Sequence, residues 1–336
     1  MLISLIVPIY NVKQYFEEFI NSVERQTFLD FQVVLVDDGS NDGTEELVDK
    51  FKDNSRYKII HKTNGGVVSA WKRGVEEADG EYLAFADPDD ILDCRMMECF
   101  QSILQQYNPD MIISGYYDMY AHETICQPPA TKKVEEKLYT GEELQQIKKN
   151  LFGDEDDKTN FLFFVRWNKL FRKKLFVDNL QYTDDRIKLG DDVCATAAAV
   201  YDSQSIYFLR TPLYYYRRRE GSITTISFKS EEIDNAVILI DCLNKLLSEK
   251  GFMTEFICFK EPAWHIVYLL RKIIDGDKPY KTKKENLFEL RQHNLVKTYD
   301  IKAAKKYISA KQYWAIVLLK SKMYAFLIFL GKKSSR

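Results

Sequence analysis

Residues 81–93 read Glu-Tyr-Leu-Ala-Phe-Ala-Asp-Pro-Asp-Asp-Ile-Leu-Asp, an apolar run with strand character that ends in closely spaced carboxylates. Asp87, Asp89 and Asp90 follow this run, and acidic groups so close together raise one another's pKa unless a cation or hydrogen-bond donors compensate. Hard divalent metals take oxygen ligands and often share them with substrate phosphates. We therefore expect Mn²⁺ or Mg²⁺ to bind here and hold a diphosphate. The simpler alternative is a turn with a helix cap.

Strand and helix signals alternate on both sides of this stretch. The expected strands are residues 2–8, 31–36, 57–61, 81–86 and 111–115, and the expected helices lie at 16–23, 47–51 and 67–78. Strands that alternate with helices predict an α/β fold, Rossmann-like, with a mainly parallel central sheet flanked by helices.

Polar segments follow the first, second and fourth expected strands. Ligands of open α/β sheets bind beyond the carboxyl ends of the strands, so we expect one crevice to be lined by residues 8–11, 37–40 and 87–90. The sequence contains no G-x-G-x-x-G and no G-x-x-x-x-G-K-[ST]. Without a glycine-rich loop to hold phosphates, a metal is the expected diphosphate holder.

Composition limits the class of protein. The chain has 336 residues, 46% hydrophobic and 29% charged, which is enough for two domains. A formal net charge of -2 predicts no nucleic-acid partner. The six cysteines show no C-x-x-C, and the amino terminus lacks the basic segment of a signal peptide. We therefore expect a cytoplasmic protein with reduced thiols.

Several motifs, in order along the chain, resemble family 2 glycosyltransferases, and among these the bacterial capsule and exopolysaccharide enzymes. They are Val7-Pro8-Ile9-Tyr10-Asn11, Val36-Asp37-Asp38-Gly39-Ser40, Asp42-Gly43-Thr44, Asn64-Gly65-Gly66, and Gly80-Glu81-Tyr82 running into Asp87-Pro88-Asp89-Asp90. The similarity covers residues 1 to about 225. It implies a GT-A fold, a nucleotide-sugar donor, a divalent metal and inversion at the anomeric carbon.

The resemblance also implies roles for residues on the donor side. Asp37 and Asp38 would hydrogen-bond the base and ribose, which suits uridine and hence a UDP-sugar; a turn with a helix cap is the alternative for this segment. The nucleotide pocket would further include Pro8, Tyr10, Asn11, Gly65 and Gly66.

In the same resemblance, Asp87 and Asp89 correspond to the family's DxD metal motif. Asp89 would bind the metal directly, Asp87 would face the ribose or a metal-bound water, and Asp90 would support the pair. The metal is needed because the leaving diphosphate gains negative charge as the sugar bond breaks.

Two later segments resemble the family's acceptor-side motifs: Trp167-Asn168-Lys169-Leu170-Phe171 and Leu189-Gly190-Asp191-Asp192. The second is usually Glu-Asp, and its Asp removes the proton from the acceptor hydroxyl, as a poor nucleophile requires. Asp192 matches this base, and Asp191 is a second candidate. A helix cap is the alternative.

One segment departs from the family pattern. Where the family usually has Ser-x-x-Arg-Asn-x-Gly, this chain has Trp71 and Lys72 at the Arg and Asn positions. Trp71 either packs in the core or offers a platform to a sugar.

Residues 214–222, Tyr-Tyr-Tyr-Arg-Arg-Arg-Glu-Gly-Ser, resemble the segment that ends the family's catalytic domain. The planar fork of arginine suits a diphosphate. Alternate side chains of an extended segment share a face, so Arg217 and Arg219 form one candidate donor contact and Arg218 opposes them.

The remaining sequence predicts the domain layout. Residues 1–228 would form the catalytic domain, with a nucleotide-sugar half at 1–115 and an acceptor half at 116–228. Within the second half, residues 122–160 are expected to be a loop or a boundary, and residues 229–336 would be helical. A basic, aromatic and apolar helix at 311–333 would lie on a membrane surface, or else pack internally or on a second subunit of a homo-oligomer.

Taken together, the sequence predicts an inverting, metal-dependent glycosyltransferase of cell-surface polysaccharide synthesis, peripheral on the inner face of the cell membrane. The acceptor would be a saccharide or lipid-linked saccharide. The alternatives are a nucleotidyltransferase and a catalytically degenerate sugar- or nucleotide-binding partner subunit.

Overall fold

The computed structural model describes residues 2–120, 124–127, 135–152, 164–218 and 228–334, without the side chains of 124–127 and 331–334. The chain forms two compact units, Met1–Arg219 and Glu220–Arg336, which are described separately below. The boundary that the sequence predicts at 228/229 directly follows residues 219–227, which lie outside the described part of the chain.

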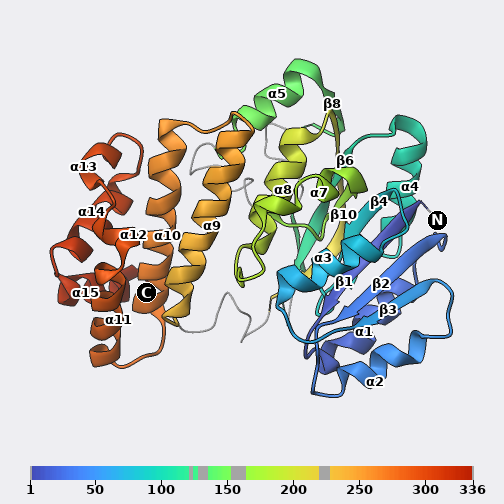
Figure 1. The fold of residues 1–336 in the computed structure, drawn as a ribbon, viewed down its shortest axis with the longest axis horizontal. Coiled ribbons are helices and arrows are strands. Elements are labelled where there is room, and N and C mark those ends of the chain that lie inside the picture. The colour runs from blue at the N-terminus through green and yellow to red at the C-terminus, as the bar shows by residue number, and fades with distance from the viewer. Residues whose placement is uncertain (1, 121–123, 128–134, 153–163, 219–227, 335–336) are drawn as a thin grey trace. The chain divides into compact units, whose positions relative to one another are not determined.

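A single ten-stranded sheet runs through the described part of the first unit (Figure 1). Its strands are β1 (Ile3–Ile9), β2 (Phe31–Asp37), β3 (Tyr57–His61), β4 (Tyr82–Phe85), β5 (Ile91–Leu92), β6 (Met111–Met119), β7 (Thr124–Gln127), β8 (Lys137–Thr140), β9 (Lys169–Arg172) and β10 (Ser205–Arg217). The order is β3-β2-β1-β4-β9-β6-β10-β5, with β7 on β6 and β8 on β10. The predicted α/β class is confirmed.

The first four strands pair in parallel, as predicted. The second half of the sheet is mixed, because β9 inserts antiparallel between β4 and β6 while β10 runs parallel to β6. The helices of this unit are α1 (Lys13–Glu24), α2 (Thr44–Val48), α3 (Val67–Glu77), α4 (Met96–Tyr107), α5 (Gly141–Lys149), α7 (Lys173–Val177) and α8 (Asp191–Asp202), with 3₁₀ turns at Asp49–Phe51 and Leu180–Tyr182.

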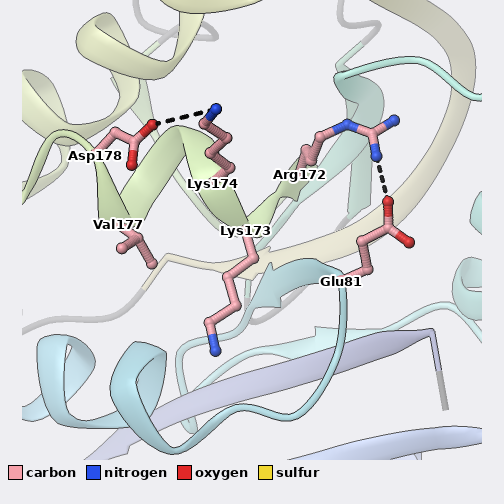
Figure 2. Close-up of a pocket in the computed structure, with 6 residues that line it drawn as sticks. All are labelled: Glu81, Arg172, Lys173, Lys174, Val177 and Asp178. Carbon is pink, nitrogen blue, oxygen red and sulfur yellow. Dashed lines mark hydrogen bonds and ion pairs between the residues drawn. The ribbon is translucent and has the colours of Figure 1, made fainter.

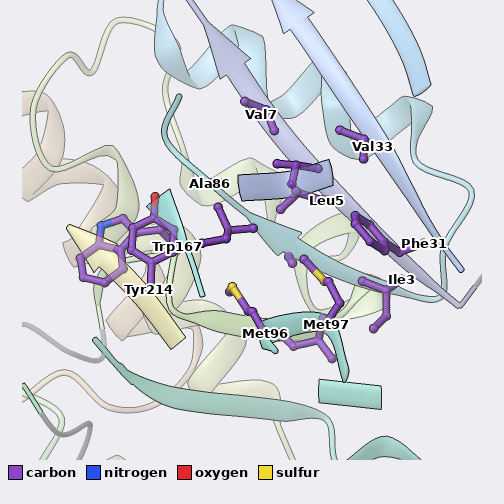
Figure 3. Close-up of a cluster of buried hydrophobic side chains, with 14 of the residues drawn as sticks. Ile3, Leu5, Val7, Phe31, Val33, Ala86, Met96, Met97, Trp167 and Tyr214 are labelled. Carbon is purple, nitrogen blue, oxygen red and sulfur yellow. The ribbon is translucent and has the colours of Figure 1, made fainter. Parts of the chain in front are cut away.

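Helices cover both faces of the sheet, which explains why every residue of β1 and β2 is buried. Side chains of α1 and α4 pack with one face of β1, and part of this core is shown in Figure 3. On the other face α3 approaches so closely that a Cβ on Gly74 would lie 2.4 Å from Cγ2 of Ile6. Only glycine allows this contact, and it fixes the distance of α3 from the strands.

The region 122–160, predicted as loop, contains regular structure where it is described. β7 pairs with β6, β8 pairs with β10, and α5 follows β8. These elements look polar in sequence because they are peripheral: the buried residues of α5 are Leu144 and Lys148. Lys148 Nζ donates to the carbonyls of Tyr201 and Ser203 at 2.8 and 2.6 Å. A cation at a helix carboxyl end is favourable, so α5 fixes the end of α8.

The second unit is helical where described, as predicted. It contains α9 (Glu231–Glu249), α10 (Glu255–Asp275), α11 (Tyr280–Gln292), α12 (Asn294–Lys297), α13 (Ile301–Ala304), α14 (Ala310–Lys320) and α15 (Tyr324–Ser334). Its core gathers apolar residues of α10 with those of the helices that follow it, Ile316, Leu319 and Leu327 among them.

The single helix predicted at 311–333 is in fact two helices, α14 and α15, joined by residues 321–323. Lys322 has a left-handed φ of 62° at the break. Lys320 turns inward, and its Nζ donates to the carbonyls of Val296 and Tyr299 at 2.8 and 2.6 Å. This tether ends α14. Across the described residues, no helix is both long and apolar enough to cross a membrane.

Candidate active site

The ends of β1, β2 and β4 lie side by side, because β1 pairs in parallel with both β2 and β4. The pairing continues beyond the strands, since the N–H of Asp38 donates to the carbonyl of Ile9 at 2.8 Å. Three polar segments therefore begin at the same edge of the sheet, as predicted: residues 8–11, 37–40 and 87–90.

Asn11 joins the first two segments. Its φ of 51° lies in the left-handed region that asparagine tolerates. Its N–H donates to Ser40 Oγ at 3.0 Å, and its Oδ1 accepts from the N–H of Asn41 at 2.8 Å. Pro8 is buried within β1, whereas Tyr10 is 49% exposed. Tyr10 therefore presents a ring to solvent beside this edge.

Asp38 organises the loop that follows β3. Its Oδ1 accepts from the N–H of Gly65 at 2.9 Å, and its Oδ2 accepts from the N–H of Gly66 at 2.8 Å. Lys62 Nζ forms an ion pair with the same carboxylate. Asp38 is buried, so these partners satisfy a charge that would otherwise be costly. The candidates Asp38, Gly65 and Gly66 thus form one connected unit.

Asp37 contacts a histidine rather than the glycine loop. Its Oδ1 accepts from the N–H of Ser40 at 3.1 Å, and its Oδ2 lies 3.0 Å from Nδ1 of His61. Nε2 of His61 lies 3.0 Å from Oδ1 of Asp49. Burial opposes a charge on His61, but the hydrogen bonds to Asp37 and Asp49 outweigh it and raise the histidine pKa.

The segment after β4 is fixed by Tyr214 of β10. The Tyr214 hydroxyl accepts from the N–H of Asp87 at 3.0 Å and donates to Oδ2 of Asp90 at 2.8 Å. Oδ1 of Asp90 accepts from the N–H of Arg217 at 2.8 Å. Both oxygens of the buried Asp90 are therefore engaged within the protein. Asp87 and Asp89 are less buried.

The start of α8 carries the two candidate bases. Gly190, at a φ of 81°, turns the chain into the helix, so that Asp191 and Asp192 form its first turn. The buried Arg166 lies against both: its Nη2 is 2.8 Å from Asp191 Oδ2, and its Nη1 is 2.5 Å from Asp192 Oδ1. A helix amino terminus favours carboxylates, which explains why both acids are tolerated here.

Electrostatics link the two groups of carboxylates. Burial raises the pKa of Asp192 to about 7, although Arg166 acts in the opposite direction. Burial, together with the charges of Asp89 and Asp192, raises the pKa of Asp87 to about 8. Because the charge of Asp192 acts on Asp87, the segment after β4 and the start of α8 belong to one site with excess negative charge.

The donor set fits a divalent metal that is shared with a substrate. No three Asp, Glu, His or Cys side chains of the described residues are arranged to hold a metal by themselves. Mg²⁺ commonly takes only one or two carboxylates and completes its shell with phosphates and water. Both oxygens of Asp90 are engaged within the protein, and Asp87 and Asp89 would supply such a pair of hard oxygen ligands.

Of the candidate arginines, Arg217 lies beside the carboxylates. Its Nε donates to the carbonyl of Asp89 at 2.7 Å, and its Nη2 donates to Glu18 at 2.6 Å. Arg218 instead pairs with Asp118 at 2.6 Å, which fits the expected alternation. Arg219 lies outside the described residues.

The acceptor-side candidates Trp167, Asn168 and Lys169 are buried. Trp167 stacks on Tyr214, with ring centroids 4.7 Å apart, and both rings are labelled in Figure 3. Asn168 Nδ2 donates to the carbonyl of Ser114 at 2.7 Å, and Lys169 Nζ donates to Asn168 Oδ1 at 2.7 Å. In this structure the three side chains brace the chain that carries Arg166.

Trp71 belongs to the core, the first of the two alternatives for this residue. It is fully buried, and the guanidinium carbon of Arg166 lies 5.1 Å from its ring centroid. Lys72 points to another segment, where its Nζ donates to Asp185 at 2.7 Å.

Arg166 is the residue that the sequence reasoning missed. It precedes the Trp167 motif directly, but its partners lie 25 and 26 positions further along the chain. Only the fold brings them together. The available signal was weak: two adjacent acids at an expected buried site require a cation nearby.

A shallow hollow on the first unit lies away from this site (Figure 2). Its lining includes Glu81, Arg172, Lys173 and Asp178. Glu81 precedes β4, whereas Asp87 follows it. Arg172 already pairs with Glu81 and Asp110, and Lys173 Nζ donates to the carbonyl of Ala78 at 2.6 Å. Arg172 and Lys173 are thus engaged in contacts within the protein, and we do not regard the hollow as a second candidate active site.

Comparison with known proteins supplies the context for this geometry. Residues 4–179 match the model of a family described as "Glycosyl transferase family 2". The "Uncharacterized glycosyltransferase EpsJ" of Bacillus subtilis (strain 168) is 31% identical over 229 residues, 68% of this chain and 64% of EpsJ. The match thus spans just under two thirds of EpsJ. "Glycosyltransferase GlyG" of Streptococcus pneumoniae serotype 4 is 30% identical over 253 residues, 74% of this chain and 80% of GlyG.

The crystal structure of residues 1–349 of TarS from S. aureus, in complex with UDP-GlcNAc, is similar in fold. The TM-score is 0.69 at 18% identity, covering 100% of this chain and 92% of that one. TarS is named as a poly(ribitol-phosphate) beta-N-acetylglucosaminyltransferase, and its full sequence is 26% identical over 262 residues, 74% of this chain and 42% of TarS. The structural likeness establishes the GT-A fold.

Proposed function

Because the chain belongs to glycosyl transferase family 2, we propose that this glycosyltransferase moves a sugar from a UDP-sugar to a hydroxyl of a saccharide or lipid-linked saccharide. The step would invert the anomeric carbon and depend on Mn²⁺ or Mg²⁺, and the product would be a cell-surface polysaccharide. The binding of UDP-GlcNAc by TarS, which shares the fold, supports UDP as the nucleotide.

One observation carries the proposal: the carboxylates of the β4 segment and of α8 interact, because the charge of Asp192 raises the pKa of Asp87. Displacement of a nucleotide from a sugar needs a base for the acceptor hydroxyl and compensation for the leaving diphosphate. Asp192, whose pKa is about 7, can hold a proton near neutral pH. It is our base.

The other residues have separate tasks in this scheme. Asp87 and Asp89 would hold the cation, which when bound offsets the charge that develops on the diphosphate. Arg217, fixed to the same segment by its bond to the Asp89 carbonyl, lies where it can also face the diphosphate. Asp37 and Asp38, at the end of β2, would read the uridine.

The alternatives are less well supported. A nucleotidyltransferase would leave Asp192 and Arg166 without a role, and the family match favours glycosyl transfer. A catalytically degenerate binding subunit would not need a base of pKa about 7. Incubation with a panel of nucleotide sugars and Mn²⁺, followed by NMR of the released sugar and nucleotide, distinguishes these functions.

We also propose that α14 and α15 rest on an anionic membrane surface, which would bring the enzyme to a lipid-linked acceptor on the cytoplasmic side. These helices bury one side in the core of their unit, and with the residues that join them they expose several large apolar side chains: Trp314, Met323, Phe326, Phe329 and Leu330. Residues 301–336 contain nine Lys or Arg and no Asp or Glu. Apolar and cationic groups together favour an anionic lipid surface.

Vesicle binding tests this surface. The protein should sediment with vesicles that contain anionic lipid and only weakly with zwitterionic ones. Trp314→Ala should weaken binding by about tenfold, because burial of a large aromatic side chain contributes about 1.5–3 kcal/mol. Trp264 of α10, 49% exposed, is the matched control, and Trp264→Ala should leave binding unchanged. Equal loss in both variants, or no binding to anionic vesicles, would contradict the proposal.

A further inference from the structure

Arg166 stands out because it is a buried cation with an unusual set of neighbours. Its side chain is 6% exposed and contacts two carboxylates, Asp191 and Asp192. A buried guanidinium is stable only when carboxylates or other acceptors compensate for its lost hydration. Here one arginine serves two acids, so the group keeps an excess negative charge.

Two aromatic rings hold the guanidinium in place. Its central carbon lies 5.1 Å from the ring centroid of Trp71 on α3 and 5.5 Å from that of Phe85 at the end of β4. Trp71 itself packs edge-on against Phe176 at 5.9 Å. Aromatic faces attract cations and exclude water, which strengthens the ion pairs beneath them. The position of Arg166 is therefore set from three elements.

Arg172 provides a comparison within the same unit. Its Nε donates to Asp110, its Nη1 to Glu81 and its Nη2 to Asn108, and its guanidinium carbon lies 4.7 Å from the ring centroid of Tyr82. Every nitrogen has an acceptor.

By contrast, Nε of Arg166 has no hydrogen-bond partner among the described residues, and its contact with Asp192 Oδ1 is an ion pair without hydrogen-bond alignment. Arg166 therefore acts on the two acids mainly through its charge and less through directed hydrogen bonds.

The groups that act on Asp192 come from three segments. Asp191 on the same helix raises the Asp192 pKa, while Arg166, directly before the Trp167 motif, and Lys169, within that motif, lower it. Asp87, after β4, repels it. Lys169 has a pKa well below its usual range because it is buried. Arg166 is therefore the dependable positive charge beside Asp192.

We propose that Arg166 is the positioning residue of the glycosyl-transfer site: it clamps Asp191 and Asp192 at the start of α8, and its fixed charge keeps Asp192 ionised enough to accept the acceptor's proton. Trp71 and Phe85 are the platform of this clamp. The role rests on the proposed function, because Asp192 acts as a base only if a hydroxyl is its substrate. The clamp itself is a property of the folded protein.

Arg166→Gln tests the clamp, with Arg166→Lys and Arg172→Gln beside it. Arg166→Gln should lower kcat about 10–100-fold, as loss of an outer partner of a reacting group does. It should also move the acid limb of the pH–rate profile to higher pH by about one to three units, the effect of a removed neighbouring charge. Arg166→Lys keeps a positive charge but lacks the planar guanidinium. The acid limb of its pH–rate profile should therefore stay near that of the unaltered protein. Arg172→Gln should not move the limb.

A second readout does not need turnover. Carbon-13 NMR of labelled aspartate, recorded with Mg²⁺ present, should show the Asp192 carboxyl titrating at higher pH in Arg166→Gln and unchanged in Arg172→Gln. An unchanged titration in Arg166→Gln would overturn the clamp, whether or not the enzyme turns over. A shifted titration without transfer from any donor would leave the clamp standing and contradict the proposed function.

Discussion

Replacing Asp192 with asparagine should lower turnover by about 10²–10⁴-fold, the usual contribution of a general base, while donor binding stays near that of the unaltered enzyme. The amide has nearly the shape of the carboxylate but cannot take a proton from the acceptor hydroxyl. The fold should survive, since Arg166 keeps its contact with Asp191 at 2.8 Å. Initial rates and isothermal titration with UDP separate the two effects.

The stability of Asp192→Asn follows from the sign of the pKa shift. Burial raises the Asp192 pKa to about 7, above its value in an unfolded chain. Above pH 7 the folded state therefore carries an unfavourable ionised carboxylate, and stability falls as pH rises through that value. Asp192→Asn removes this effect, so its melting temperature at pH 8 should be no lower than that of the unaltered protein.

Asp191→Asn is the control for the choice of base. Asp191 contacts the same arginine but is the second candidate, so its loss should reduce turnover less than the loss of Asp192. Full transfer activity in Asp192→Asn, or a larger effect of Asp191→Asn, would show that the base is assigned wrongly.

The second large effect is expected for Asp89→Ala, which should reduce turnover at least about 100-fold, because metal stabilisation of a leaving group is worth several kcal/mol. It should also weaken donor binding in Mn²⁺ and abolish the difference between Mn²⁺ and EDTA. The backbone carbonyl of Asp89 accepts from Arg217 Nε at 2.7 Å. Alanine keeps that backbone bond.

Asp90→Ala gives the contrast. Asp90 accepts from the Tyr214 hydroxyl and the N–H of Arg217, and loss of buried hydrogen bonds of this kind costs about 1–3 kcal/mol. This variant should therefore melt at a lower temperature than the unaltered protein. If Asp89→Ala bound the donor more tightly in Mn²⁺ than in EDTA by the same factor as the unaltered protein, Asp89 would not be a metal ligand.

Local patterns were sufficient for much of the fold. Apolar runs and helical spacing predicted β1 to β4 and α3, because these elements are buried on the faces that the pattern marks. The rule for strand ends then placed residues 8–11, 37–40 and 87–90 at one edge, and the pairing of β1 with β2 and β4 confirms this placement.

Long-range contacts explain what sequence reasoning missed. The positions of Arg166 against Asp191 and of Tyr214 against Asp90 depend on how β9, β10 and α8 return to the first sheet half. No periodicity encodes such pairs. The break between α14 and α15 was missed for a similar reason, since Lys320 is drawn inward by distant carbonyls. Short peripheral strands such as β7 and β8 lack the apolar alternation that reveals buried strands.

The central claim is inverting transfer from a nucleotide sugar at the site of Asp87, Asp89 and Asp192. Proton NMR of the sugar released from UDP-GlcNAc, with water as acceptor and Mg²⁺ present, tests it without knowledge of the natural acceptor. The sugar is α-linked in this donor, so inversion predicts that the β anomer appears first and then equilibrates, and that Asp192→Asn releases almost none. If no nucleotide sugar of the panel is cleaved, or the α anomer appears first, the account is contradicted.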